Sequence, residues 1–299
     1  MSISISETDL PLPLFCRGKV RDTYHLDGML LIISTDRLSA FDVVLPDPIP
    51  DKGLVLNQLS RFWFEKTSQV VPNHLVASVD TIDSLKHYFP DKATPPDYLV
   101  GRSMITLKAE RVPVECVVRG YISGSAWVEY KKAGTISGMS AAKGLQESQE
   151  LPQPLFTPTT KADTGHDEPL TKKEMESLVG KTTAGKLEES SLAVYQFARD
   201  YARGRGVIIA DTKFEFGFVE DKLILIDELL TPDSSRFWDA SQYTVGRSQP
   251  SFDKQPVRDW LTASGWNKEP PAPPLPPEVI EATTRRYREA YQRLTGRTL

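Results

Sequence analysis

The clearest pattern in the chain is an alternation of polar and apolar residues within 206–238. Asp211, Lys213 and Glu215 occupy alternate positions, and threonine and phenylalanine residues stand between and after them. Successive side chains of a β-strand point to opposite faces, so the charges share one face and the aromatic rings share the other. A second apolar run over 223–226 follows a short polar break, and the two runs together predict a β-hairpin.

The length of the hairpin loop decides which residues face each other. A two-residue loop at 220–221 would place Glu215 opposite Ile226 and would turn Asp227 toward the aromatic face. A three-residue loop at 220–222 places Glu215 opposite Asp227 and the phenylalanines opposite an almost wholly apolar set, so we expect this register. Two facing carboxylates are destabilising unless a cation lies between them, and magnesium is a natural candidate. An exposed hairpin whose lysine neutralises the acids is the alternative that this stretch alone leaves open.

Similar patterns predict the remaining elements. The turn sequence Asp27-Gly28 lies between two runs of strand-forming residues and indicates a hairpin over 14–36. Further strands are expected over 98–111 and 112–119. Helices are expected over 54–67, from Ser125 to about 132, from the capping box at Thr171, over 186–203 and over 278–294. Loops are expected over 34–42 and 134–158, and a stiff proline-rich spacer over 270–277.

The first strand of the N-terminal hairpin is basic. Arg17, Lys19 and Arg21 alternate on one face, and Gly18 lies between two of them. Such a strand can lie across a polyphosphate, because the glycine lets the backbone approach and the cations neutralise charge. A single glycine is not a Walker loop or a dinucleotide fingerprint. Taken alone, this feature is more typical of a solvated basic edge strand.

Composition narrows the class of protein. The chain has 299 residues, 39% hydrophobic and 25% charged, which is typical of one large or two ordinary globular domains. A net charge of −4 argues against a general nucleic-acid binder but permits a local basic pocket. Cys16 and Cys116 form neither a metal-ligand spacing nor a disulfide framework, which favours a reducing, cytoplasmic setting. No apolar run approaches the ~20 residues that span a bilayer.

The charged residues favour one kind of chemistry. The histidines form no zinc-binding cluster, and no serine nucleophile motif is present. Cations recur at turns and strand ends, at Lys19, Arg21, Arg119, Lys161, Lys213 and Arg236. Acidic groups gather on the face of the long hairpin, at Asp211, Glu215 and Asp227. This combination suits the transfer of charged phosphate with a metal ion and predicts a magnesium-dependent nucleotide enzyme.

Ordered motifs add a resemblance to a known family. The chain resembles phosphoribosylaminoimidazole-succinocarboxamide synthases (SAICAR synthetases), with matches spread from residue 15 to about 243. The matching segments are 18–22 (GKVRD), 112–125 (VPVECVVRGYISGS), 209–217 (IADTKFEFG) and 227–236 (DELLTPDSSR). Ser123 departs from the Thr or Ala expected there, but it keeps a small side chain. Four motifs in the family's order are far more specific than any one of them.

The resemblance implies a fold and a reaction. It implies an α+β fold in two lobes, with an N-terminal antiparallel β-lobe over 1–112 and a larger α/β lobe over 113–299, similar to kinases and ATP-grasp enzymes around the nucleotide cleft. It implies a ligase of de novo purine biosynthesis. ATP, the carboxyaminoimidazole ribonucleotide CAIR and L-aspartate would give SAICAR, ADP and phosphate through an acyl phosphate. A monomer or homodimer acting on small molecules is expected, without nucleic acid or membrane.

The resemblance also implies a role for each candidate residue. Gly18, Lys19 and Arg21 would cover the ATP phosphates. Glu215 and Asp227 would hold Mg²⁺ between ATP and the CAIR carboxylate. The ribonucleotide phosphate would be taken by Arg119, Ser125 and Arg236. Lys161 and Lys213 would offset charge on the transferred group or on substrate carboxylates, and Asp211 would orient a lysine or substrate. The L-aspartate site is placed only broadly, in the loops at 34–42 and 134–160.

Other interpretations remain for single residues and for the whole protein. If these residues are purely structural, Lys213 only neutralises its strand neighbours, Arg119 closes a structural ion pair, and Ser125 only caps a helix. A small-molecule kinase of the same architecture would release ADP without needing aspartate. A nucleotide-binding module without chemistry is the third possibility, although binding alone would not require the paired carboxylates.

Overall fold

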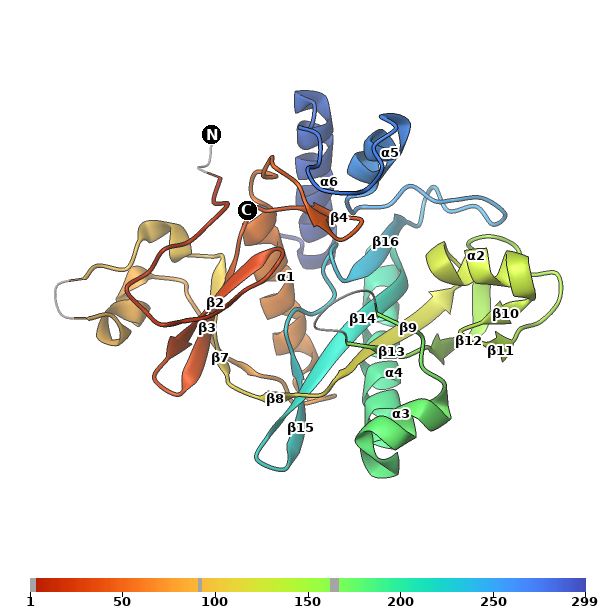
Figure 1. Ribbon diagram of the computed structural model, residues 1–299, viewed down its shortest axis with the longest axis horizontal. Coiled ribbons are helices and arrows are strands. Elements are labelled where there is room, and N and C mark those ends of the chain that lie inside the picture. Colours follow the sequence, from red (N-terminus) through yellow and green to blue (C-terminus); the bar gives the residue numbers. More distant parts are fainter. Residues whose placement is uncertain (1–3, 91–92, 162–166) are drawn as a thin grey trace.

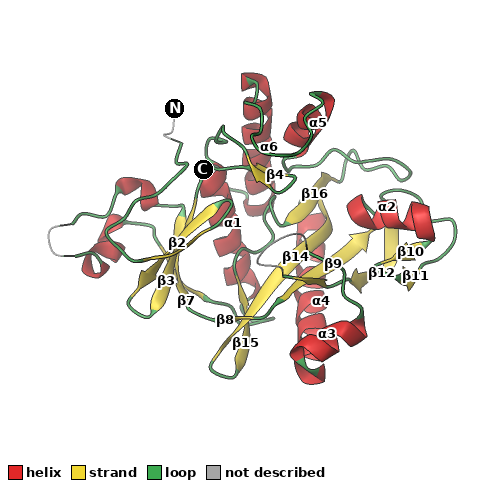
Figure 2. Cartoon of the chain, in the orientation of Figure 1, coloured by secondary structure: helices red, strands yellow, loops and turns green. Residues whose placement is uncertain are grey.

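The computed structural model describes residues 4–90, 93–161 and 167–299. These residues form helices and two main antiparallel sheets, which confirms the predicted α+β class (Figures 1 and 2). Within the same ranges, no helix is both long enough and apolar enough to cross a membrane.

The first sheet is built from the N-terminal part of the chain. Its strands are ordered β1-β2-β3-β7-β6, and each neighbouring pair is antiparallel. Asp27 and Gly28 form the turn between β2 and β3 with φ of 48° and 80°, so the predicted hairpin is confirmed. The strands of this sheet are β1 (Leu14–Arg17), β2 (Arg21–Leu26), β3 (Met29–Ser34), β6 (Leu75–Ser78) and β7 (Ser103–Leu107).

The second sheet is organised around the long strand β14. This strand pairs with β9, β15, β16 and β8, and β9 pairs in turn with β12 and β13. The strands of this sheet are β8 (Glu110–Arg111), β9 (Val114–Tyr121), β12 (Glu150–Phe156), β13 (Thr159–Thr160), β14 (Val207–Val219), β15 (Lys222–Ile226) and β16 (Ser235–Asp239). Two small hairpins complete the strands: β4 (Ser39–Ala40) with β5 (Val43–Val44), and β10 (Thr135–Ile136) with β11 (Met139–Ser140).

The predicted register of the β14–β15 hairpin is wrong. Val219 pairs with Lys222 and Glu215 pairs with Ile226, so the loop has two residues rather than three. Glu220 takes a left-handed backbone with φ of 52°, which allows the tight turn without a glycine. Asp227 is itself left-handed, with φ of 68°, and lies just beyond β15. The chain therefore leaves the ladder before Asp227, and the expected conflict with the aromatic face does not arise.

Helices flank the sheets and close the core. The helix α1 lies between the two sheets, and α4 packs on β14 and β9 (Figure 1). One core cluster joins Trp63 of α1 with Ile32 of the first sheet and Phe214 of the second. The helices are α1 (Lys52–Thr67), α2 (Gly124–Ala133), α3 (Lys172–Val179), α4 (Lys181–Arg203), α5 (Gln255–Ala263) and α6 (Pro277–Thr295), with 3₁₀ turns η1 (Ile82–Tyr88) and η2 (Asp97–Leu99).

Several local predictions hold and others need correction. The capping box of α3 is present, with Thr171 and Glu174 exchanging hydrogen bonds. Ser123, not Ser125, is the N-cap residue of α2. The expected loop over 134–158 contains β12, whose prolines obscure its pattern. Proline lacks a backbone donor and is tolerated because β12 is an edge strand of the sheet.

The C-terminal part of the chain forms two helices, α5 and α6, joined by the proline-rich segment. Helix α5, for which no helix was predicted, packs on α6, and α6 packs on α1 (Figure 2). Leu261 of α5 and Leu275 of the proline-rich segment share a hydrophobic cluster with Leu38 and Ile49. This packing brings the start of α5 to the cleft described next.

Candidate active site

A charged cleft of about 1020 Å³ is lined by residues of both sheets and of α5. All residues predicted to bind ATP and metal meet in it, together with the two predicted catalytic lysines, although they come from distant parts of the chain. These are Gly18, Lys19, Arg21, Lys161, Lys213, Glu215 and Asp227. Arg119, Ser125, Arg236 and Asp211 are not in this lining and form a neighbouring cluster along β14.

Alternate residues of β14 point to opposite faces, and one of these faces lines the cleft. Lys213 and Glu215 line the cleft, and the intervening Phe214 and Phe216 are fully buried in the core. The two faces predicted from the sequence are therefore confirmed, although the register of the partner strand is not. Burying the two phenylalanines fixes the strand, because each large aromatic side chain contributes roughly 1.5–3 kcal/mol of burial free energy.

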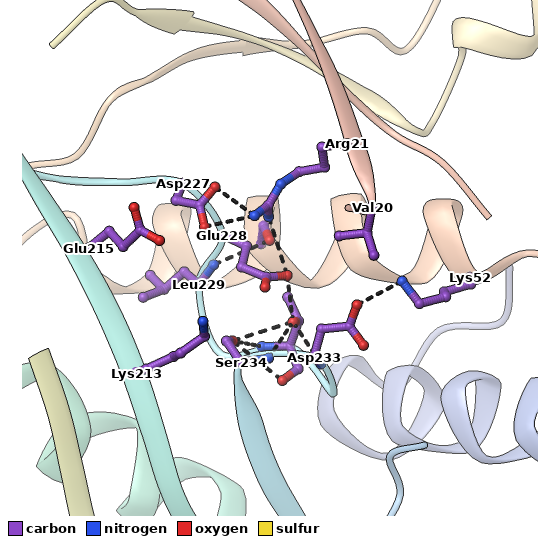
Figure 3. Close-up of polar contacts among 12 residues, drawn as sticks. Val20, Arg21, Lys52, Lys213, Glu215, Asp227, Glu228, Leu229, Asp233 and Ser234 are labelled. Carbon is purple, nitrogen blue, oxygen red and sulfur yellow. Dashed lines mark hydrogen bonds and ion pairs between the residues drawn. The ribbon is translucent and has the colours of Figure 1, made fainter. Parts of the chain in front are cut away.

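Asp227 enters the cleft through its left-handed backbone and meets Arg21 there. Nη2 of Arg21 lies 2.7 Å from Oδ1 of Asp227 and also donates to Oδ2 at 2.7 Å (Figure 3). Nη1 of Arg21 lies 3.4 Å from Oε2 of Glu228. Figure 3 shows Glu215 beside this group, on β14. Arg21, which was predicted to bind the ATP phosphates, thus forms an ion pair with Asp227, which was predicted to bind the metal ion.

The glycine-containing turn before β2 forms another wall. Nζ of Lys19 donates to Oδ1 of Asp42 at 2.6 Å, which joins this turn to the β4–β5 hairpin. Phe41 and Asp42 both have positive φ, of 52° and 65°. Of the two segments expected to hold L-aspartate, 34–42 contributes Ser39, Phe41 and Asp42 to the cleft, whereas no described residue of 134–160 lines it.

Glu115 on β9 joins the two lysines of the cleft. Its Oε1 accepts hydrogen bonds from Nζ of Lys161 at 2.7 Å and from Nζ of Lys213 at 3.0 Å. Nζ of Lys161 also lies 2.8 Å from Oε1 of Glu215. Burial alone would raise the pKa of Glu115, but Lys213 and Lys161 hold that pKa below its ordinary value. The same contacts keep the lysines charged, because the carboxylates outweigh burial and raise the pKa of Lys161.

The carboxylates of Glu215 and Asp227 influence each other. Burial, followed by the charge of Asp227, raises the pKa of Glu215, even though Lys161 is paired with it. Burial would also raise the pKa of Asp227, but Arg21 and then Lys161 hold it below its ordinary value. A cation between the two would relieve this repulsion. Mg²⁺ commonly takes one or two carboxylates together with substrate phosphates and water, so these two residues fit it. In the described part of the chain, no group of three or more potential ligands gathers.

The second cluster lies beside the cleft and is centred on Asp211, two residues before Lys213 on β14. Asp211 pairs in register with Arg119 of β9 and with Arg236 of β16. Its Oδ2 accepts from Nη1 of Arg119 at 3.1 Å and from Nη1 of Arg236. Nη2 of Arg119 donates to Oγ of Ser125 at 3.4 Å. Asp211 was expected to orient a lysine or substrate, but among the described residues it holds two arginines.

Gly124 completes this arginine cluster. Its φ is +55°, and a Cβ atom at this position would lie 2.4 Å from Nη2 of Arg236. The glycine is therefore required both by its left-handed backbone and by the close approach of the guanidinium. Three predicted phosphate ligands, Arg119, Ser125 and Arg236, are brought together as the sequence motifs suggested.

Some cleft residues were not predicted as site residues. Glu115 had a usable signal, because it shares a strand face with Arg119, opposite the buried Val114 and Cys116. Lys254 and Arg258 had none, since they reach the cleft only through the packing of α5.

Asp233 is another cleft residue that was not predicted. It is held by Nζ of the buried Lys52 at 2.7 Å and by Oη of Tyr287, which donates at 2.7 Å. These partners lie far away in the sequence, on α1 and α6. Burial alone would raise the pKa of Asp233, but Lys52 and then Lys254 hold it well below its ordinary value.

The two antiparallel sheets, and a cleft lined by both cations and carboxylates, define the class: an α+β protein with a highly charged cleft. The family model for SAICAR synthetase matches residues 14–273. The chain therefore belongs to the SAICAR synthetase family, as its motifs indicated.

Individual relatives agree with this assignment along almost the whole chain. The chain is 50% identical over 299 residues to the phosphoribosylaminoimidazole-succinocarboxamide synthase of Maridesulfovibrio salexigens, covering 99% of this chain and 98% of the relative. It is 51% identical over 298 residues to the enzyme of that name from Syntrophobacter fumaroxidans, covering 99% and 97%. A solved structure, the SAICAR synthase from Saccharomyces cerevisiae complexed with SAICAR, superposes with a TM-score of 0.90 at 46% identity, covering 99% of each chain.

Proposed function

We propose that this chain is the ATP-dependent ligase that joins L-aspartate to the carboxylate of CAIR, giving SAICAR, ADP and phosphate in de novo purine biosynthesis. The observation that carries the proposal is the cleft itself. In a member of this family, it gathers Arg21, Lys161, Lys213, Glu215 and Asp227 within one cavity. The reaction brings together substrates that are all anionic, and this cleft supplies the opposite charges that such an assembly requires.

The ATP phosphates are assigned to the N-terminal wall of the cleft. Gly18 lets the backbone approach the phosphates, and Lys19 and Arg21 supply positive charge. Glu215 and Asp227 are the residues that would hold Mg²⁺. When bound, this ion neutralises phosphate charge and polarises the phosphoryl oxygens. Arg21 is paired with Asp227 in the structure, and we infer that it turns toward the phosphates once the carboxylate has another cation.

The transferred phosphoryl group is assigned to the two lysines. Lys161 and Lys213 project from opposite sides of Glu115 and carry charges that the carboxylates stabilise. In this position they would offset charge as the CAIR carboxylate attacks the γ-phosphorus of ATP. The same lysines would then stabilise the oxyanion when the amine of aspartate attacks the acyl phosphate and expels inorganic phosphate.

The phosphate of CAIR is assigned to the arginine cluster. Arg119 and Arg236 share the carboxylate of Asp211, which holds both guanidinium groups on one face. Arginine suits this task because its planar fork can donate two parallel hydrogen bonds to a phosphate. Ser125 adds a hydroxyl donor beside Arg119. Because β14 carries Asp211, which pairs with both arginines, as well as Lys213 and Glu215 of the cleft, it would set the distance between the CAIR phosphate and the reacting carboxylate.

L-Aspartate is assigned to the side of the cleft formed by 34–42 and α5. Ser39 comes from the segment expected for this substrate, and Lys254 and Arg258 add cations from the start of α5, which packs against that segment. A dicarboxylate needs positive partners that ATP and CAIR do not already occupy, and this pair meets that requirement.

The lobes and the setting complete the proposal. We divide the chain functionally at residue 112, because the first sheet lies wholly within 14–107 and all strands of the second sheet except β8 (Glu110–Arg111) follow residue 112. The free thiols of Cys16 and Cys116 are consistent with a reducing, cytoplasmic setting. A monomer or homodimer stays the expected assembly.

Release of ADP provides the test. The protein is incubated with ATP and Mg²⁺, and CAIR and L-aspartate are added singly and together. Sustained release only with both substrates, accompanied by SAICAR, is expected. Turnover that ignores aspartate would favour a kinase, and no turnover under any combination would favour a binding module.

A further inference from the structure

Glu115 occupies a special position in the cleft. Its carboxylate is almost completely buried, and one of its oxygens accepts hydrogen bonds from both lysines. The ammonium groups lie 2.7 and 3.0 Å from that same oxygen, so they must also lie close to each other. No role for Glu115 follows from the contacts proposed above for ATP, CAIR or aspartate.

The fold builds this arrangement from three segments. β13 pairs with β9 so that Thr159 lies opposite Glu115, which carries Lys161 to the carboxylate. β14 pairs with the other edge of β9, where Lys213 lies opposite Val117. Beneath them, Val114 and Cys116 are buried and hold β9 in place. Glu115 therefore stands between the two lysine-bearing segments and is fixed by the core.

The two ammonium groups repel each other, because both lie within 3.0 Å of the same oxygen of Glu115. Without the shared carboxylate, each would turn toward a different carboxylate or toward water. Lys161 has a second partner in Glu215 at 2.8 Å, which would draw it away from Lys213 if Glu115 were neutral. The side chain of Lys213 is more exposed than that of Lys161, at 39% against 21%, and would be free to reorient. The shared carboxylate opposes both movements.

We propose that Glu115 is a positioning residue that holds Lys161 and Lys213 together as one paired cation site for the transferred phosphoryl group. It acts through the lysines and touches no substrate. Its role rests on the proposed function, because the lysine pair needs a phosphoryl group on which to act. Its effect therefore belongs to the chemical steps rather than to substrate binding, which other residues provide.

The test is a double-mutant cycle with separate kcat and KM values. Aspartate-dependent ADP release is measured for the wild type, E115Q, K213Q and the double variant, together with SAICAR formation. E115Q is expected to lower kcat about 100-fold and to leave KM for ATP and CAIR within about threefold. In the K213Q background the same substitution should cost less than about tenfold, because the pair it holds is already broken.

A matched control comes from outside the cleft. Nζ of Lys172 lies 2.9 Å from Oε2 of Glu188, and E188Q removes an ion pair of the same kind from the protein surface. This variant should keep kcat within about twofold of the wild type. If E115Q does not fold, the double variant keeps the net charge of the wild type. Its kcat should then lie within about tenfold of that of K213Q alone.

The outcomes distinguish failure of the proposed function from failure of the positioning role of Glu115. A wild-type protein without aspartate-dependent turnover would contradict the proposed function and, with it, the role of Glu115 that rests on this function. With an active wild type, equal costs of E115Q in both backgrounds would overturn the positioning role. An unchanged kcat with a lowered melting temperature would also overturn it, since that result describes a purely structural residue.

Discussion

Asp227→Asn is the substitution that most directly probes the paired carboxylates. Asparagine has nearly the same shape as aspartate but removes one negative charge from the cleft. In the structure, both oxygens of Asp227 lie 2.7 Å from Nη2 of Arg21, and Glu215 is its neighbour across the cleft. The variant therefore loses a charge that serves two partners, a cation of the protein and the Mg²⁺ ion that we propose.

The expected magnitudes of these two effects differ. A hydrogen bond to a charged group contributes about 1.5–3 kcal/mol, but Arg21 keeps Glu228 at 3.4 Å and the amide oxygen of asparagine. The loss of stability should thus be about 1 kcal/mol, a few degrees in Tm. Loss of one of two carboxylate ligands should raise the Mg²⁺ concentration for half-maximal activity at least about tenfold, which is about 1.4 kcal/mol.

The assay is initial ADP release as a function of free Mg²⁺, at saturating ATP, CAIR and aspartate. High Mg²⁺ should restore part of the activity of D227N. The control is Asp239→Asn, because Asp239 also pairs with an arginine, Arg293 at 3.0 Å, but lies outside the cleft. Lost activity with an unchanged Mg²⁺ dependence would refute the metal role, even if the protein remained folded.

The same variant makes a pH prediction with a definite sign. Burial and then the charge of Asp227 raise the pKa of Glu215, so its ionised form is disfavoured in the wild type. Removing the charge of Asp227 lets Glu215 ionise at lower pH. At fixed Mg²⁺, the acid limb of the activity profile of D227N should therefore move to lower pH. A limb that moves to higher pH, or stays in place, would contradict the coupling.

Two further predictions concern residues outside the carboxylate pair. Burial lowers the pKa of His74 to about 4, so the unfolded chain takes up a proton first and stability should fall by about 1.4 kcal/mol per pH unit as pH drops from about 6.5 toward about 4. Melting curves at several pH values should show this loss, and His74→Gln should reduce it; an equal slope in the variant would exclude His74 as its source. Gly124→Ala should displace Arg236 and raise KM for CAIR at least about tenfold with a smaller effect on ATP, because its Cβ would lie 2.4 Å from the guanidinium. Gly134→Ala has a similar left-handed backbone with open space around it, so it is the control, and an equal rise in KM there would assign the effect to backbone strain.

The sequence was sufficient for features that depend on neighbouring residues in the chain. The faces of β14 follow from alternation alone, and Lys213 and Glu215 line the cleft as predicted while Phe214 is buried. The register of its partner strand was wrong because it depends on backbone angles. Glu220 and Asp227 both adopt positive φ without being glycine, which no local pattern indicates.

Features that depend on tertiary packing could not be predicted. Lys254 and Arg258 reach the cleft because α5 packs on α6, and the hydrophobic cluster beneath them includes residues near both ends of the sequence. The partners of Asp233 lie on α1 and α6, so their pairing is invisible in the sequence. The arginine cluster was found from motifs, but its ordering by Asp211 required the pairing of β14 with two strands.

The ion pairs of the cleft explain how it can hold so many charges. Lys19 is paired with Asp42, Arg21 with Asp227, and Lys161 with Glu215, so opposite charges largely compensate one another within the cavity. Binding of ATP and a cation would then exchange one set of partners for another, because phosphates take the protein cations while the metal takes the carboxylates. Such an exchange avoids exposing unpaired charges in a buried site, where they would be destabilising. Glu215 and Asp227 do not need to face each other on paired strands to act together, because they need only line the same cleft. We infer that the left-handed backbone of Asp227, just after the ladder ends at Ile226, is what brings its carboxylate into the cleft with that of Glu215.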